Sequence, residues 1–210
     1  LNQIRKFKLS DIELIIIDDG STDRSVQKIE EMYQACERRF VRFEFRHRPN
    51  KGLCATLNEA LEWCEGIYFS PSASDDILVI QKISSQVNAF KNNHNIVAVF
   101  TGIFLIDQDK NILATKGSRE KFTFKDVFLR TQLMPGQAVM LVTKEIKQIG
   151  GYDESIKIED LDLFLRLGEQ GFWFLSIETP LVYYRKHGNN LSGNHQIMLD
   201  AIYTILEKYK

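Results

Sequence analysis

The first ninety residues alternate short apolar runs with amphipathic stretches. Residues 13–17 form a run rich in β-branched side chains, too short for a buried helix and typical of a parallel strand buried on both faces. Apolar side chains then recur at helical spacing over residues 26–36. The alternation continues with a strand at 41–45, a helix at 53–64, a strand at 67–69 and a helix at 77–90. Because parallel strands need crossover connections, this order predicts an α/β sheet flanked by helices.

From residue 96 onward the pattern becomes less regular. Two strand-like runs, 97–100 and 102–106, precede a hairpin turn at 109–111 and a strand at 112–114. The other expected elements are a short helix at 122–129, strands at 137–143, 172–175 and 181–184, a helical turn at 144–149, a helix at 159–168 and a terminal helix at 197–209. The sequence has no repeat, low-complexity tract or linker, so we expect one domain over residues 1–210.

Composition narrows the class of protein. Of 210 residues, 44% are hydrophobic and 26% are charged, which is typical of a globular chain. The 27 basic and 28 acidic side chains give a net charge of −1, so no broad basic field favours nucleic-acid binding. Three cysteines without C-x-x-C spacing predict reduced, intracellular thiols rather than disulfides or a zinc site. No apolar run approaches the roughly 20 residues that span a bilayer, and the first residues lack a signal-peptide core.

Acidic side chains gather at three places where a strand ends or a helix begins. Asp18 and Asp19 follow the first predicted strand, Ser74, Asp75 and Asp76 follow the third, and the pair at 159–160 opens a later helix. Ligands of open α/β sheets bind beyond the carboxyl ends of the strands. Crowded carboxylates repel one another unless a cation or hydrogen-bond donors lie between them. Mg²⁺ or Mn²⁺ held by one or two carboxylates together with substrate phosphates meets this requirement.

A purely structural interpretation is open for each group. Residues 18–21 could form a turn with helix-capping side chains. Residues 74–76 could cap a helix that begins at Ile77. Glu159 and Asp160 could simply interact favourably with the dipole of their own helix. His187 alone is typical of a solvated or hydrogen-bonded loop residue. The order and spacing of these groups carry more weight than any one of them.

Five segments together resemble the family 2 glycosyltransferases, which have the GT-A fold. Residues 15–23 resemble the nucleotide-binding motif of that family, and residues 50–58 resemble its N-x-G-L-S-A-A-R-N segment. The other three are residues 66–76, ending like its D-x-D motif, residues 150–154 with 159–167, similar to G-G-F-D-E…E-D-x-D-L-x-L-R-L, and residues 184–192, similar to Y-R-x-H-x-x-N-x-S with Asn190 and Ser192. The five segments stand in the family's order and cover nearly the whole chain.

The resemblance implies a Rossmann-like, mostly parallel central sheet and a transfer reaction. The donor would be a nucleotide-diphospho-sugar, with a UDP-sugar expected, and Mn²⁺ or Mg²⁺ would be required. The acceptor would be a saccharide or lipid-linked hydroxyl, attacked with inversion during cell-surface polysaccharide or lipopolysaccharide synthesis. Residues 1–95 would form the nucleotide-binding half and residues 96–210 the acceptor-side half. A cytoplasmic location follows, with peripheral contact at the inner face of the plasma membrane allowed and no nucleic-acid partner.

The resemblance also implies roles for individual residues. Asp160 matches the general base, supported by Glu159, and Asp75 matches the metal ligand, with His187 reaching the metal or the pyrophosphate. The residues expected to contact substrate are Asp18, Asp19, Asn50, Gly52, Ser74, Asp76 and His187. These roles suit the chemistry, because a cation stabilises the negative charge of the leaving diphosphate and a carboxylate activates the acceptor hydroxyl.

Three features depart from the family pattern. Residues 1–7 resemble the end of the helix that follows the family's first strand, so the strand with its P-x-Y-N segment is missing and we expect the natural chain to extend N-terminally. Ala73 replaces the first Asp of D-x-D, and Leu57 replaces an Arg. These departures motivate an alternative, a catalytically degenerate domain that binds nucleotide sugars. A nucleotidyltransferase or phosphatase is a third class, but it leaves the later Glu-Asp and Tyr-Arg-x-His segments unexplained.

Overall fold

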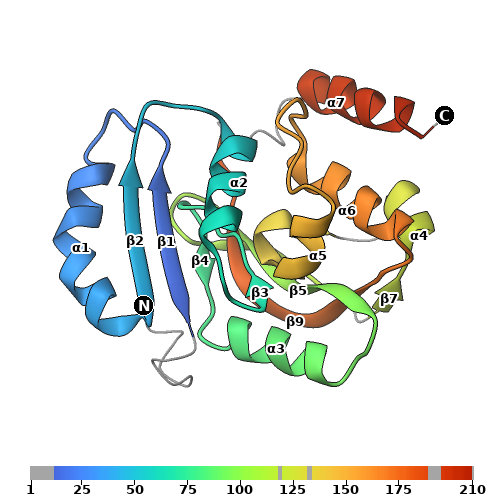
Figure 1. Ribbon diagram of the computed structural model, residues 1–210, viewed down its shortest axis with the longest axis horizontal. Helices are drawn as coiled ribbons and strands as arrows, with labels where there is room; N and C mark the ends of the chain where they lie inside the picture. The colour runs from blue at the N-terminus through green and yellow to red at the C-terminus, as the bar shows by residue number, and fades with distance from the viewer. Residues whose placement is uncertain (1–11, 118–119, 132–133, 189–194, 210) are drawn as a thin grey trace.

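The computed structural model describes residues 12–117, 120–131, 134–188 and 195–209. In chain order the elements are β1 (Glu13–Asp18), α1 (Ser25–Arg39), β2 (Arg42–His47), α2 (Leu53–Trp63), β3 (Tyr68–Phe69), β4 (Ile77–Leu78), α3 (Lys82–Lys91), β5 (Ile96–Ile106), β6 (Ile112–Lys116), β7 (Glu120–Phe122), α4 (Phe124–Phe128), the 3-10 turn η3 (Gly136–Ala138), β8 (Val139–Val142), α5 (Thr143–Gln148), α6 (Glu159–Glu169), β9 (Trp173–Arg185) and α7 (His195–Glu207). The expected alternation of strand and helix is confirmed from β1 to β3 (Figure 1). No helix within the described ranges is long and apolar enough to cross a bilayer.

The strands form two sheets. β1 and β2 pair in parallel over six positions. The larger sheet has the order β3-β8-β5-β9-β4, with β6 added to β5 and β7 added to β9. β5 and β9 pair in parallel over ten positions, whereas the five shorter pairings in this sheet are antiparallel. The two longest pairings are thus parallel, as expected for an α/β fold.

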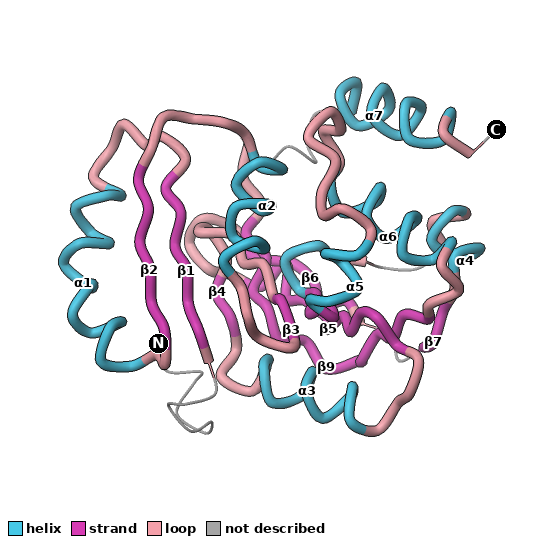
Figure 2. Tube along the Cα trace, in the orientation of Figure 1, coloured by secondary structure: helices cyan, strands magenta, loops and turns pink. Residues whose placement is uncertain are grey.

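Helices cover both faces of the sheet. Successive side chains of a strand point to opposite faces, and β5 shows this directly. Ala98 and Phe100 belong to the main core with α2, α5 and α6, whereas Val99 packs in a second cluster with α3. Figure 2 shows α2, α5 and α6 next to one another, with α1 beyond β2. The main core is rich in aromatic rings, and the centroids of Phe100 and Phe164 are 5.0 Å apart in an edge-to-face contact.

Several predicted boundaries were wrong. Residues 77–78 are not the start of a helix but the strand β4, which pairs with Val182 and Tyr183 of β9, and the helix begins only at Lys82. Two pairs of predicted strands merge into the long strands β5 and β9. Phe122 belongs to β7 rather than to the following helix. In each case pairing with a strand distant in the sequence decided the outcome.

The burial expected for the first strand is also corrected. Only Asp18 of β1 is buried, and the other five residues are half-buried. In the described part of the chain β1 pairs along one edge only, with β2. Residues 1–7, which resemble a helix end, lie outside the described residues, as do Asn190 and Ser192. The three cysteines, Cys36, Cys54 and Cys64, are free and buried.

Candidate active site

The end of β1 is held by hydrogen bonds to its own carboxylate. Oδ1 of Asp18 accepts from the backbone N–H groups of Gly20 and Ser21, at 3.2 and 2.9 Å, and lies 2.9 Å from Nδ1 of His47. Burial raises the pKa of Asp18, but these hydrogen bonds outweigh it and lower the pKa to about 2. The side chain is therefore ionised at any physiological pH.

Asp19 holds the loop that precedes α2. Its Oδ2 accepts from the Gly52 N–H at 2.9 Å, and its Oδ1 accepts from the Lys51 N–H at 2.9 Å and from the Arg48 guanidinium. Gly20 has a φ of +91°, and a β-carbon there would lie 2.8 Å from the backbone nitrogen of Asn50. The structure thus brings Asp18, Asp19, Asn50 and Gly52 together. Each carboxylate, however, is already bonded to donors of the chain itself.

The capping interpretation of residues 18–21 is wrong for α1. That helix begins at Ser25, and its cap residue Arg24 makes no side-chain capping bond. Asp23 instead accepts a hydrogen bond from the Ser25 N–H at 2.8 Å. The segment therefore serves the contact with residues 50–52 rather than the start of a helix.

The second acidic group is joined to the end of β9. Oδ2 of Asp75 lies 2.8 Å from Nε2 of His187, and Oδ1 of Asp76 accepts from the Arg185 N–H at 2.9 Å. Nε of Arg185 donates to the Asp75 carbonyl at 3.0 Å. Asp75, Asp76 and His187 thus come together, while Ser74 is exposed. The alternative that residues 74–76 cap a helix is wrong, because the strand β4 follows them.

The side chains of this second acidic group include atoms that could coordinate a divalent cation. Oδ2 of Asp76 is buried and makes no hydrogen bond among the described residues. Burial and the neighbouring charge of Asp75 raise the pKa of Asp76 to about 6. Carboxylate oxygens and an imidazole nitrogen are ligands that Mn²⁺ accepts, and Mg²⁺ prefers oxygen. In the part of the chain described, no three acidic, His or Cys side chains are arranged around a metal position. A cation here would therefore need further ligands from substrate or water.

The third acidic group opens α6. Oδ1 of Asp160 accepts from the Leu161 N–H at 2.7 Å. Burial raises the pKa of Glu159, and with the nearby Asp160 charge brings it to about 7; burial also raises the pKa of Asp160. Gly136 faces this pair, since a β-carbon there would lie 2.8 Å from Oδ2 of Asp160. A carboxylate with raised proton affinity is suited to act as a general base.

Sequence reasoning missed the role of Asn58. Its side-chain amide binds both backbone groups of Tyr152, accepting from the N–H at 2.8 Å and donating to the carbonyl at 2.9 Å. It also donates to Glu154 at 3.0 Å. The loop that leads to Glu159 is therefore fastened to α2. The motif match at residues 50–58 pointed to Asn58, but its partner could not be read from the sequence.

Two other residues of the motif, Asp162 and Arg166, hold α6 in place and have no chemical role in the candidate site. Arg166 donates to the carbonyls of Ile149 and Gly151, at 3.0 and 2.7 Å, and to Oδ2 of Asp162 at 2.8 Å. The buried Asp162 also accepts from Nζ of Lys208 at 2.7 Å. Leu57, which replaces the family's Arg, packs against the main core. The motif segment at residues 150–167 therefore includes residues that stabilise the fold as well as the acidic pair Glu159 and Asp160.

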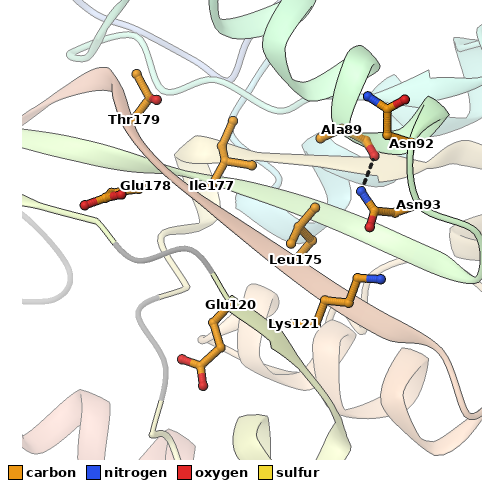
Figure 3. A pocket seen from close by; sticks show the side chains of 9 residues that line it. All are labelled: Ala89, Asn92, Asn93, Glu120, Lys121, Leu175, Ile177, Glu178 and Thr179. Carbon is orange, nitrogen blue, oxygen red and sulfur yellow. Dashed lines mark hydrogen bonds between the residues drawn. The ribbon is translucent and has the colours of Figure 1, made fainter.

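Two cavities of the described structure lie away from the three acidic groups. A cavity of about 500 Å³ opens between the end of α3, β7 and β9, beside Asn93, Lys121 and Ile177 (Figure 3). Another of about 470 Å³ lies between α5 and the end of α6. Neither is lined by a predicted site residue. The convergence of the three acidic groups on one substrate stays a prediction.

Comparison with known proteins places the chain in a family. A model described as Glycosyl transferase family 2 matches residues 1–143. An uncharacterized glycosyltransferase of Methanocaldococcus jannaschii is 26% identical over 205 residues, which is 95% of this chain and 70% of that protein. The chondroitin synthase of Escherichia coli is 28% identical over 169 residues, covering 78% of this chain but only 23% of the synthase. The chain therefore corresponds to a small part of such large synthases.

Solved structures show the same fold. Residues 1–349 of TarS from S. aureus superpose with a TM-score of 0.66 at 16% identity, covering 95% of this chain and 57% of that one. A mannosyltransferase from Pyrobaculum calidifontis, solved with GDP-Man and Mn²⁺, gives a TM-score of 0.68 at 11% identity, covering 99% and 59%. The expected GT-A fold is confirmed. The chain belongs to glycosyltransferase family 2.

Proposed function

We propose that this chain is a metal-dependent, inverting glycosyltransferase that moves a sugar from a nucleotide-diphospho-sugar to an acceptor hydroxyl. Membership of family 2 supports glycosyl transfer. The observation that carries the mechanism is Asp160, a carboxylate with a raised pKa that faces Gly136. A single general base with no second nucleophilic carboxylate is what an inverting displacement requires, and such a base contributes about 10²–10⁴-fold to the rate.

Each acidic group has a part in this proposal. Asp160 takes the proton of the attacking hydroxyl, and burial of its carboxylate raises its pKa and so its proton affinity. Asp75 and His187 would hold Mn²⁺ or Mg²⁺ together with donor phosphates, and Asp76 would face the donor. A cation bound there would stabilise the negative charge of the departing nucleotide diphosphate. Asp19 shapes the loop at residues 50–52, against which the nucleoside would lie, and Asp18 shapes the turn at residues 18–21.

We propose the substrates, the biosynthetic role and the location of this protein from what its similar proteins are named for. Chondroitin and hyaluronan synthases are among the similar proteins, and neighbouring structures were solved with GDP-Man or UDP and Mn²⁺. We therefore propose a UDP-sugar donor, a saccharide or lipid-linked acceptor and a role in cell-surface polysaccharide synthesis. The cytoplasmic face of the membrane is the proposed location. Residues 1–95 and 96–210 are proposed as the donor and acceptor halves.

A degenerate nucleotide-sugar-binding domain is the second candidate. It is favoured by Ala73, which leaves the acidic loop with one carboxylate fewer than the family pattern and is exposed in the structure. Calorimetry with nucleotide sugars, with and without Mn²⁺, distinguishes the two functions when it is combined with turnover. Binding that needs no metal and leads to no product would favour this candidate.

The test is a donor screen by released nucleotide, with UDP-glucose, UDP-galactose, UDP-N-acetylglucosamine and GDP-mannose, followed by Asp160→Asn on the active donor. We expect metal-dependent release, and a loss of at least about 100-fold in kcat for Asp160→Asn with donor binding retained, since a general base contributes about 10²–10⁴-fold. Glu169→Gln, at the exposed far end of α6, is the control. Undiminished turnover in Asp160→Asn would remove Asp160 from the proposed role.

A further inference from the structure

Two polar side chains on one face of α3 are completely buried. Lys82 and Gln86 lie one helical turn apart, and both are 0% exposed. Burying an amine costs free energy unless it finds partners, and in the described part of the chain Lys82 forms no ion pair with a carboxylate. An apolar side chain of similar volume would avoid this cost. The contacts that Lys82 does make therefore need an explanation.

The amine of Lys82 joins two segments of backbone. Its Nζ donates to Oγ of Ser70 at 2.7 Å and lies 3.5 Å from the carbonyl oxygen of Val139. Ser70 closes the triangle by donating to the same carbonyl at 2.9 Å. Burial lowers the pKa of Lys82 to about 7, so near neutral pH the amine can lose its charge and still donate these bonds.

Gln86 strengthens the same attachment. Its Nε2 donates to the carbonyls of Val99 and Ala138, at 2.8 and 2.9 Å. Two consecutive carbonyls, of Ala138 and Val139, are thus bound by side chains of α3. These residues end η3 and begin β8.

Both segments lead to the candidate active site. Ser70 begins the loop that carries Asp75 and Asp76 to β4. Residues 138–139 lie two and three positions after Gly136, where a β-carbon would lie 2.8 Å from Oδ2 of Asp160. The triangle of Lys82, Ser70 and Val139 therefore connects the loop of the proposed metal ligand with the segment beside the proposed base.

We propose that Lys82 is a positioning residue, which sets the loop of Asp75 against the Gly136–Val139 segment that faces Asp160. It reaches no substrate from its buried place and acts through Ser70 and Val139. This inference rests on the proposed function for its catalytic consequence, but the mechanical link itself can be measured without turnover. Misplacement of reacting groups by about 1 Å costs on the order of 100-fold in rate, so a small shift here would be seen in kcat.

The test compares Lys82→Met with Lys91→Met, the same change at an exposed position of α3. In hydrogen exchange without ligand, we expect faster exchange in residues 70–76 and 136–139 of Lys82→Met only. With the donor that is active in the screen and saturating Mn²⁺, we expect kcat to fall about 10- to 100-fold while KM for the donor stays within about twofold. Exchange and kcat equal to those of Lys91→Met would overturn the proposal.

Ser70→Ala covers the case in which Lys82→Met does not fold. Removing this one hydroxyl breaks two sides of the triangle, so we expect a fall in kcat of about tenfold and the same local increase in exchange. Wild-type values in both measurements would overturn the proposal. If the wild-type chain turns over no donor, the proposed function fails, while the exchange experiment still decides whether Lys82 links the two segments.

Discussion

At the scale of single residues, protonation of the neighbouring carboxyl groups of Glu159 and Asp160 affects both the proposed catalysis and the stability of the folded protein. Burial and mutual repulsion raise the pKa of Glu159 from its ordinary value of 4.5 to about 7. A folded-state pKa above the unfolded value means that the folded protein holds a proton more tightly, so stability falls as pH rises between 4.5 and 7. A general base, in contrast, works only when it is deprotonated. Activity and stability should therefore change in opposite directions over this range.

We predict that kcat/KM, measured at saturating Mn²⁺, declines as pH falls through the raised pKa of Asp160, above the usual range of an aspartate, whereas the melting temperature does not decline until the pH is lower. Glu159→Gln removes a buried carboxyl group that is ionised at pH 8, so its stability at pH 8 should increase. Glu169→Gln should leave both curves in place. A wild-type acid limb centred near 4 would contradict the assignment.

Asp18 and Asp19 illustrate a different use of carboxylates. Together they accept hydrogen bonds from four backbone N–H groups, of Gly20, Ser21, Lys51 and Gly52, and their ionised state is stabilised by them. Their first task is thus to shape the loops at residues 18–21 and 50–52. Any contact with a nucleoside would be made by groups that are already fixed in place, which lowers the entropic cost of binding.

At the scale of elements, α2 connects two of the three acidic groups. Its first turn follows the loop bound by Asp19, and Asn58 further along binds Tyr152 in the loop that leads to α6. Leu57 on the same helix packs into the main core. The helix therefore transmits the position of one loop to the other through packed side chains and hydrogen bonds.

We predict that Asn58→Leu lowers the free energy of unfolding by about 2 kcal/mol, because it leaves both backbone groups of Tyr152 without their side-chain partner. Hydrogen exchange of residues 151–158 should increase at the same time. The matched control is Asn88→Leu, at an exposed position of α3, which should change stability by less than about 0.5 kcal/mol. Equal effects of the two variants in urea unfolding would contradict this role.

At the scale of the whole molecule, the C-terminal helix α7 packs against the part of the protein that carries Glu159 and Asp160. Ala201 and Ile205 of α7 join the main core, and Tyr209 packs beside Phe124 and Phe128. Lys208 bridges two acidic side chains, Asp153 at 2.8 Å and the buried Asp162 at 2.7 Å. The C-terminal helix is thereby attached to both ends of the segment that carries Glu159 and Asp160.

We predict that Lys208→Met destabilises the protein by about 1–2 kcal/mol. Breaking a buried ion pair costs more than this, but about a third of the Lys208 side chain is exposed and Arg166 still pairs with Asp162. The Asp153 pKa, which the Lys208 ammonium holds far below its usual range, should rise. Lys144→Met, an exposed lysine of α5, serves as the control in urea unfolding at pH 7. A loss no larger than that of the control would show that α7 is held by its apolar contacts alone.

The sequence by itself determined the alternation of strands and helices up to β3, the helix α6 and the five motif segments, because side-chain periodicity and local motifs report on each segment separately. Only the tertiary structure decided that Ile77 and Leu78 form a strand, that Asp75 meets His187 and that Gly136 lies against Asp160. The partners in these contacts are separated by 24 positions for Gly136 and Asp160 and by up to 112 positions for Asp75 and His187. Local patterns contain no information about which distant segment supplies the partner, whereas folding brings the two together.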